Sequence, residues 1–238
     1  MTILIKNIDC IEGMKELDKN SVDLVVTSPP YNIGIDYNEY KDKKEWSEYE
    51  SFIKEVFKNI HRLLKDKSIF SLNVGNQRNS GLPHYMYFWL KELGFKIIKE
   101  IFWYKGLYYI QGETIFVTSK TGEYNKFYND NDGFYANGQF STVWEMRYNK
   151  KQSKKHLKHE AIFVEQIPYN FIMISTKEND IVLDPFSGSG TTAVACKKTN
   201  RNFIGFEIDK KYLDGSLKRL NKTYKQKYMI KERLDKWL

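Results

Sequence analysis

The sequence predicts an α/β protein with an open, mostly parallel sheet and helices on both faces. Stretches with strand character alternate with stretches of helical period along most of the chain. In addition, the β-branched run at residues 22–27 is typical of a strand buried on both faces of a parallel sheet. A length of 238 residues suits one large core, so we expect a single domain over residues 1–238.

Each expected element follows from apolar spacing and from the residues that end it. We expect strands at residues 3–5, 22–27, 68–74, 96–103, 181–184 and 202–207, and helices at residues 10–17, 46–64, 85–93, 168–174, 192–198 and from 212 onward. The alternation lapses between residues 104 and 158, where Gly, Asn and Asp are frequent. We expect a small insert there, with a hairpin formed by residues 115–117 and 124–128.

The net charge of +8 is concentrated in two places. Residues 210–238 hold ten Lys or Arg against three Asp or Glu, and Lys150, Lys151, Lys154 and Lys155 cluster inside the insert. Such clusters favour contacts with phosphate groups, although solvated surface runs have the same composition. Aromatic residues make up 16% of the chain, which suits stacking on bases but also fits an AT-rich genome.

Several classes of protein are not expected from this sequence. The longest apolar run is six residues, at positions 85–90, so we expect no membrane span, and Asp9 interrupts any leader-like stretch near the start. Cys10 and Cys196 have no Cys or His neighbours at metal-ligand spacing, so we predict no metal site. Two isolated cysteines suit a reducing cytoplasm.

A glycine loop follows the strand expected at residues 181–184. Asp184 is followed by Pro-Phe-Ser-Gly-Ser-Gly-Thr-Thr, in which Gly188 and Gly190 allow a tight turn and close approach to a ligand. Glu207 ends the next strand, close to the spacing at which an acidic side chain binds ribose hydroxyls in nucleotide sites. A nucleotide-like cofactor is therefore predicted, the alternative being a plain turn with Glu207 as a helix cap.

The motif Ser28-Pro29-Pro30-Tyr31 follows the strand expected at residues 22–27. Two prolines fix successive φ angles and hold the carbonyl group of Pro29 rigidly. Beside the hydroxyl of Ser28, this carbonyl forms a pair of acceptors for an exocyclic amine, and Tyr31 supplies a ring for stacking. The motif therefore favours a planar heterocycle that carries an NH₂ group as the substrate.

Together, Thr27-Ser28-Pro29-Pro30-Tyr31 and the segment 184–192 resemble the β class of S-adenosylmethionine-dependent DNA amino-methyltransferases, in which the catalytic motif precedes the cofactor loop in a circularly permuted order. The resemblance spans nearly the whole chain. It implies a Rossmann-like methyltransferase fold with about seven strands, S-adenosylmethionine as cofactor, and a base flipped out of double-stranded DNA. The cofactor residues that it implies, besides the glycine loop and Glu207, are Asp9, Cys10, Phe163, Phe186, Thr191 and Thr192.

Ser28 stands where many adenine-modifying relatives have Asp, and the resemblance therefore favours the N4 amine of cytosine over the N6 amine of adenine. A non-catalytic DNA- or nucleotide-binding subunit is a second hypothesis, and an enzyme that modifies protein glutamine is a third. The resemblance also places target recognition in the short insert, with its Lys cluster on DNA. A restriction-modification system is expected, and a cognate restriction endonuclease and a homodimer are left open as partners.

Overall fold

The computed structural model describes residues 1–34, 36–37, 40–75, 80–106, 112–127, 135–136, 139–146 and 164–234, of which 36–37, 40–41, 135–136 and 223–234 are described by their backbone alone. The helices are α1 (Cys10–Lys15), α2 (Trp46–Leu63), α3 (Leu82–Glu92), α5 (Gln166–Ser175), α6 (Thr191–Lys198) and α7 (Lys210–Leu234). The strands of the main sheet are β1 (Ile3–Lys6), β2 (Val22–Thr27), β5 (Leu64–Gly75), β6 (Lys96–Tyr104), β7 (Gly112–Ser119), β10 (Val143–Glu145), β11 (Ile181–Asp184) and β12 (Asn202–Phe206).

Strand order in the main sheet is β1-β12-β11-β2-β5-β7-β6-β10. All pairs are parallel except the two that β7 makes, with β5 and with β6. Two short ribbons lie outside this sheet, β3 (Asp36–Tyr37) with β4 (Tyr40–Lys41) and β8 (Tyr135–Ala136) with β9 (Gln139–Phe140). The predicted open, mostly parallel sheet is confirmed.

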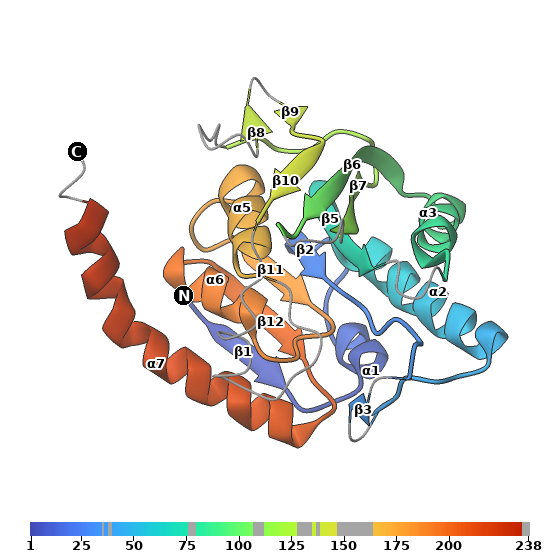
Figure 1. Cartoon of the computed structure of the whole chain (residues 1–238), viewed down its shortest axis with the longest axis horizontal. Coiled ribbons are helices and arrows are strands. Elements are labelled where there is room, and N and C mark those ends of the chain that lie inside the picture. The colour runs from blue at the N-terminus through green and yellow to red at the C-terminus, as the bar shows by residue number, and fades with distance from the viewer. Residues whose placement is uncertain are drawn as a thin grey trace.

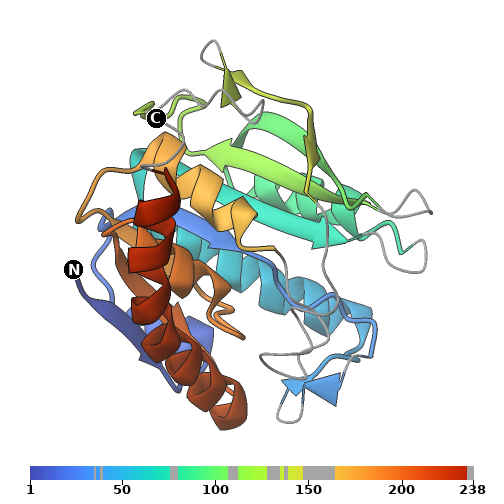
Figure 2. The same cartoon turned by 60° about the vertical axis from the view of Figure 1, so that its left-hand side comes forward.

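Helices cover both faces of the sheet, as Figure 1 shows. One core cluster joins α1, α2 and α3 to one face, and includes Met14, Phe57 and Met86. The second joins α5 and α6 to the other face, and includes Phe171 and Cys196. The helix α7 lies along the outside of α6 (Figure 2). In the part of the chain that the structure describes, no helix is long and apolar enough to cross a membrane.

The region between residues 104 and 146 differs from the prediction. Residues 115–117 belong to β7, which is buried on both faces between β5 and β6, and the predicted hairpin with residues 124–128 is wrong. Residues 125 and 127 instead make backbone hydrogen bonds with Lys67 and Ile174. The sheet has eight strands, one more than the expected seven, because β10 adds to β6 at the edge and its Trp144 is fully buried against Phe171.

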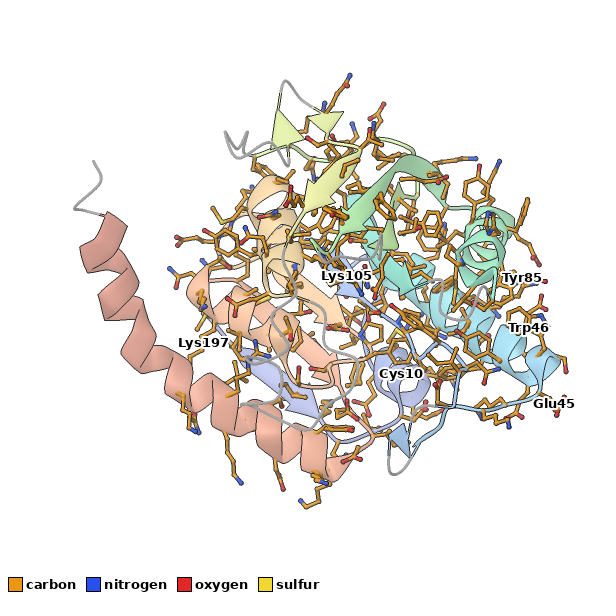
Figure 3. All side chains as sticks on the ribbon, viewed as in Figure 1. Cys10, Glu45, Trp46, Tyr85, Lys105 and Lys197 are labelled. Atoms are coloured by element: carbon orange, nitrogen blue, oxygen red, sulfur yellow. The ribbon has the colours of Figure 1, made fainter. Side chains whose placement is uncertain are left out.

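This topology brings seven strand ends to one edge of the sheet. The carboxyl ends of β1, β12, β11, β2, β5, β6 and β10 lie there, together with the start of the antiparallel β7. In open α/β sheets, ligands bind outside the carboxyl ends of the strands. Cys10 at the start of α1 and Lys105 just beyond β6 mark this edge in Figure 3.

Candidate active site

The two predicted loops leave neighbouring strands. β11, which ends in Asp184, pairs in parallel with β2, which ends in Thr27, and Leu183 lies opposite Val25. Beyond this pair, Thr27 Oγ1 donates to Asp184 Oδ1 at 2.6 Å. A direct hydrogen bond therefore joins the start of the glycine loop to the residue before Ser28.

The glycine loop is built around the buried carboxyl group of Asp184. Its Oδ1 also accepts from the backbone N–H of Phe186 at 3.1 Å, and Oδ2 accepts from Thr192 Oγ1 at 2.7 Å. Gly188 and Gly190 have φ values of 47° and 73°, in the left-handed region where L side chains are strained, and Gly190 is the N-cap of α6. The predicted turn into a helix is present.

Glu207 faces this loop from the end of β12. Its Oε2 accepts from the backbone N–H of Gly188 and its Oε1 from that of Asp209, both at 2.8 Å. Burial raises the pKa of Glu207 to about 7, although the two backbone hydrogen bonds lower it. Burial likewise raises the pKa of Asp184 to about 6, although its three hydrogen bonds lower it.

Asp9 and Cys10 follow β1, the neighbour of β12. Asp9 is the N-cap of α1, and its Oδ1 accepts from the N–H groups of Ile11 and Glu12. The thiol of Cys10 is buried, and burial together with the charge of Asp9 raises its pKa above the ordinary range. Asn7 donates to the carbonyl oxygens of residues 207 and 208, which holds this segment against the end of β12.

The Ser-Pro-Pro-Tyr motif leaves β2 as a braced loop. Tyr49 of α2 donates its hydroxyl to the carbonyl oxygen of Pro30 at 2.7 Å. Beyond the motif, the buried carboxyl group of Asp42 accepts from the N–H groups of Asn32 and Ile33. Among the described residues, the carbonyl oxygen of Pro29 accepts no hydrogen bond.

Tyr31 lies in a hydrogen-bond network that the sequence did not predict. Its hydroxyl is 2.8 Å from Ser28 Oγ, 3.3 Å from Glu113 Oε2 and 3.3 Å from Asn73 Nδ2. Asn73 Nδ2 also donates to Glu113 Oε2 at 2.5 Å, and Lys105 forms an ion pair with Glu113 Oε1. The sequence holds two signals of this network. Asn73 is a polar residue within the apolar strand β5, and Glu113 is an acidic residue at the start of an apolar run.

Two further residues support the loops, Thr27 at the start of the motif 27–31 and Arg219, which lies outside both motifs. Thr27 is described above, and Arg219 of α7 donates to Thr191 Oγ1 at 3.0 Å and to the carbonyl oxygen of Ser189 at 3.3 Å. These contacts join α7 to the start of α6 through Thr191. Phe186 is half-buried, and its ring contacts that of Phe52 edge to face. The predicted residues Lys150, Lys151, Lys154, Lys155 and Phe163 lie outside the described part of the chain.

Comparison with known proteins identifies the family. The chain matches the N6/N4 DNA methylase family over residues 22–218. The chain belongs to the S-adenosylmethionine-dependent DNA amino-methyltransferases. It is 29% identical to the Type II methyltransferase M.HpaI of Haemophilus parainfluenzae, over 95% of this chain and 76% of that protein.

Solved structures of other methyltransferases have the same fold. PvuII DNA methyltransferase, which is cytosine-N4-specific, aligns with a TM-score of 0.74 at 19% identity, over 95% of this chain and 93% of that one. M1.HpyAVI, solved in complex with SAM, aligns with a TM-score of 0.67 at 26% identity, over 92% of this chain and all of that one. The predicted family and the Rossmann-like fold are confirmed.

The residues at the glycine loop fit the chemistry of an adenosyl cofactor. The carboxyl group of Glu207 can accept hydrogen bonds from vicinal ribose hydroxyls, and Gly188 presents no side chain beside it. The side-chain oxygen of Ser187 is buried and has no hydrogen-bond partner among the described residues, so the loop retains an unused polar group. S-adenosylmethionine supplies an activated methyl group when it is bound.

Proposed function

We propose that this methyltransferase modifies the exocyclic N4 amine of a cytosine flipped out of double-stranded DNA, with its cofactor at the glycine loop and Glu207. The observation that carries the proposal is the placement of Ser28 and the Pro29 carbonyl directly after β2, beside β11, the strand that precedes the glycine loop. The proposal therefore places the amine of the base at the end of β2 and the methyl donor at the end of the adjacent β11. A buried base edge must leave the duplex to reach them.

The chemistry of the amine explains the two acceptors. Its nitrogen lone pair is delocalised into the ring, which makes the free amine a poor nucleophile. Hydrogen bonds from both amine protons to Ser28 Oγ and to the carbonyl oxygen of Pro29 favour a more tetrahedral nitrogen. The side chain of Tyr31 contributes a ring close to these acceptors, and we assign it to contact with the flipped base.

Two facts support cytosine as the target. Ser28 stands first in the motif, and the fold is similar to that of a cytosine-N4-specific enzyme. Adenine presents the same kind of amine on a six-membered ring, and the family includes N6 as well as N4 methylases. The identity of the base is therefore the part of the proposal that an experiment must decide.

The test uses the purified full-length protein and genomic DNA from cells that lack DNA methyltransferases, so that every recognition sequence is present. After incubation with methyl-labelled S-adenosylmethionine, the DNA is digested and its nucleosides are separated by mass spectrometry. We expect N4-methylcytosine, and none with the Ser28→Ala variant. N6-methyladenine alone would overturn the choice of base, and the absence of both would overturn the proposed function.

The setting of this activity is the last part of the proposal. M.HpaI and other relatives are Type II methyltransferases, which supports a place in a restriction-modification system. We assign DNA contact to Lys150, Lys151, Lys154 and Lys155, because Lys residues clustered in the sequence suit the phosphates that flank a flipped base. A cognate endonuclease would cut the same sequence when it is unmodified.

A further inference from the structure

A chain of polar side chains leads from Ser28 into the interior. Ser28 is half-buried and lies 2.8 Å from the hydroxyl of Tyr31, which lies 3.3 Å from Glu113 Oε2. Tyr31 and Glu113 are each only 8% exposed, and Glu113 is in turn ion-paired to Lys105. An acidic group on β7 is thus connected to the proposed amine acceptor through one phenol.

The charge of Glu113 sets the direction of these hydrogen bonds. The Tyr31 hydroxyl has one proton and three oxygen acceptors within 3.5 Å among the described residues, namely Ser28 Oγ, the Asn73 carbonyl and Glu113 Oε2. A hydrogen bond to a carboxylate is roughly twice as strong as one between neutral groups. Tyr31 therefore donates to Glu113.

Ser28 must then donate its own proton to Tyr31. A serine hydroxyl has one proton and two lone pairs, so both lone pairs of Ser28 Oγ stay available as acceptors. Among the described residues, the side chain of Ser28 has no other hydrogen-bond partner. An exocyclic amine offers N–H donors, and Ser28 in this state is suited to receive one.

We propose that Glu113 is a positioning residue that acts through Tyr31 to keep Ser28 an acceptor toward the amine of the target base. This inference rests on the proposed function, because it concerns the same amine. Without the carboxylate, Tyr31 is free to donate to Ser28, and the Ser28 proton then points toward the amine protons. Glu113 itself does not touch the substrate.

The surroundings of Glu113 hold its carboxyl group in a fixed place. Lys105 is largely buried, and its ammonium group lies 4.6 Å from the centre of the Trp103 ring. Trp103 is in turn fixed by a 2.8 Å hydrogen bond from its indole N–H to the carbonyl oxygen of Met146. The amide of Asn73 donates to the second carboxylate oxygen, so both oxygens of Glu113 have donors.

The first test is Glu113→Gln, which keeps the size of the side chain but replaces the charge with an amide that can donate. We expect the single-turnover rate of DNA methylation to fall about tenfold to a hundredfold, the value of a hydrogen bond to a charged group. Cofactor affinity should not change. Glu145→Gln on β10 is the matched control, because Glu145 is an exposed glutamate at the same edge of the sheet.

Glu113→Gln breaks the ion pair between Lys105 and Glu113, so a second variant removes that complication. In Lys105→Met/Glu113→Gln the buried charge is gone as well, and circular dichroism and thermal melting establish that both variants fold. We expect the rate to stay reduced in the double variant. Recovery to the wild-type rate would mean that the charge of Lys105 beside an amide caused the loss, and would overturn the inference.

The route through Tyr31 is tested with a double-mutant cycle. Tyr31→Phe keeps the ring and removes the hydroxyl, and we expect it to slow methylation to a similar extent as Glu113→Gln. Because both changes remove the same connection, the combined variant should be no slower than the slower single variant. If the reductions in rate of the two single variants multiply in the combined variant, the inference is overturned. A wild-type rate in Glu113→Gln would overturn it as well.

The wild-type assay separates this inference from the proposed function. A wild type that forms neither methylated base refutes both, whereas a wild type that methylates DNA as fast as Glu113→Gln refutes only the role of Glu113. N6-methyladenine as the product would change the target base, and the comparison of variants would still decide the role of Glu113.

Discussion

The proposed cofactor half and the proposed target half of the site are built in different ways. In the cofactor half, a contiguous loop supplies backbone N–H groups and short side chains, and Glu207, directly after β12, completes it. In the target half, Ser28 and Tyr31 depend on Asn73 and Glu113, which are 42 and 82 positions from Tyr31. A local motif is readable in a sequence, and a long-range side-chain network is not.

Asp184 lies at the boundary between the halves, and removing it should have the largest effect. Asp184→Ala leaves the hydroxyls of Thr27 and Thr192 and the N–H of Phe186 without their acceptor in a buried place. We expect the free energy of unfolding to fall by about 2–4 kcal/mol, measured by chemical denaturation, with loss of cofactor binding and methylation. Asp18→Ala, at an exposed aspartate, is the control, and equal effects of the two would contradict this role.

Glu207→Ala should break the cofactor half alone. We expect the affinity for S-adenosylmethionine to fall about tenfold to a hundredfold by calorimetry, because the proposed bonds to ribose hydroxyls are lost. The affinity for DNA should stay the same. Glu12→Ala on the exposed face of α1 serves as the comparison, and unchanged cofactor affinity in Glu207→Ala would remove this residue from the ribose site.

Tyr31→Ala should break the target half alone. Loss of the ring is expected to weaken binding of the flipped base by about 1–3 kcal/mol, as for other stacked bases, and to slow methylation accordingly. Cofactor affinity is the internal control, because Tyr31 lies on the β2 side of the boundary. A matching loss of cofactor binding would show that the halves are not independent.

The pH dependence of cofactor binding is a further test of the proposed cofactor half. Burial raises the pKa of Glu207 from 4.5 to about 7, and the ionised form is the better acceptor for ribose hydroxyls. Affinity for S-adenosylmethionine should therefore rise about five- to tenfold between pH 6 and pH 8, from the change in ionised fraction. Glu207→Gln should flatten this profile, and a profile that persists in the variant would assign it to another group.

The raised pKa of Glu207 affects stability in the opposite direction to cofactor affinity. Between pH 4.5 and about 7 the folded protein binds more protons at Glu207 than the unfolded chain does, so the contribution of Glu207 to stability decreases as pH rises. Glu207→Gln removes this contribution, and denaturation of both proteins at pH 5 and pH 8 measures the difference.

Tyr49→Phe is expected to have the smallest effect. The change removes the hydrogen bond to the carbonyl oxygen of Pro30 and leaves the buried ring in place. We expect a loss of about 0.5–1.5 kcal/mol in stability and a severalfold slower methylation rate. Tyr85→Phe on the exposed side of α3 is the control. A rate unchanged from the wild type would mean that the prolines alone hold the loop.

Local spacing predicted most of the sheet, and it also predicted the glycine turn between β11 and α6. Asp184, Gly188, Gly190 and Glu207 lie within 24 consecutive residues, and each follows from a strand, a turn or a helix start. Glu113 was missed because β7 lies antiparallel between β5 and β6. The sequence of a strand that is buried on both faces does not indicate which strands it pairs with or in which direction it runs. A tertiary pairing, not a propensity, placed it beside Tyr31.

The hydrogen bond between Thr27 and Asp184 has a consequence for how specificity can vary. These residues are 157 positions apart in the chain, yet they hold the two loops together across adjacent strands, whose separation is about 4.8 Å. The distance between the loops is therefore set by strand pairing and does not depend on the length of chain between them. Surface segments between these two strands can therefore change in length while the two loops keep their relative position.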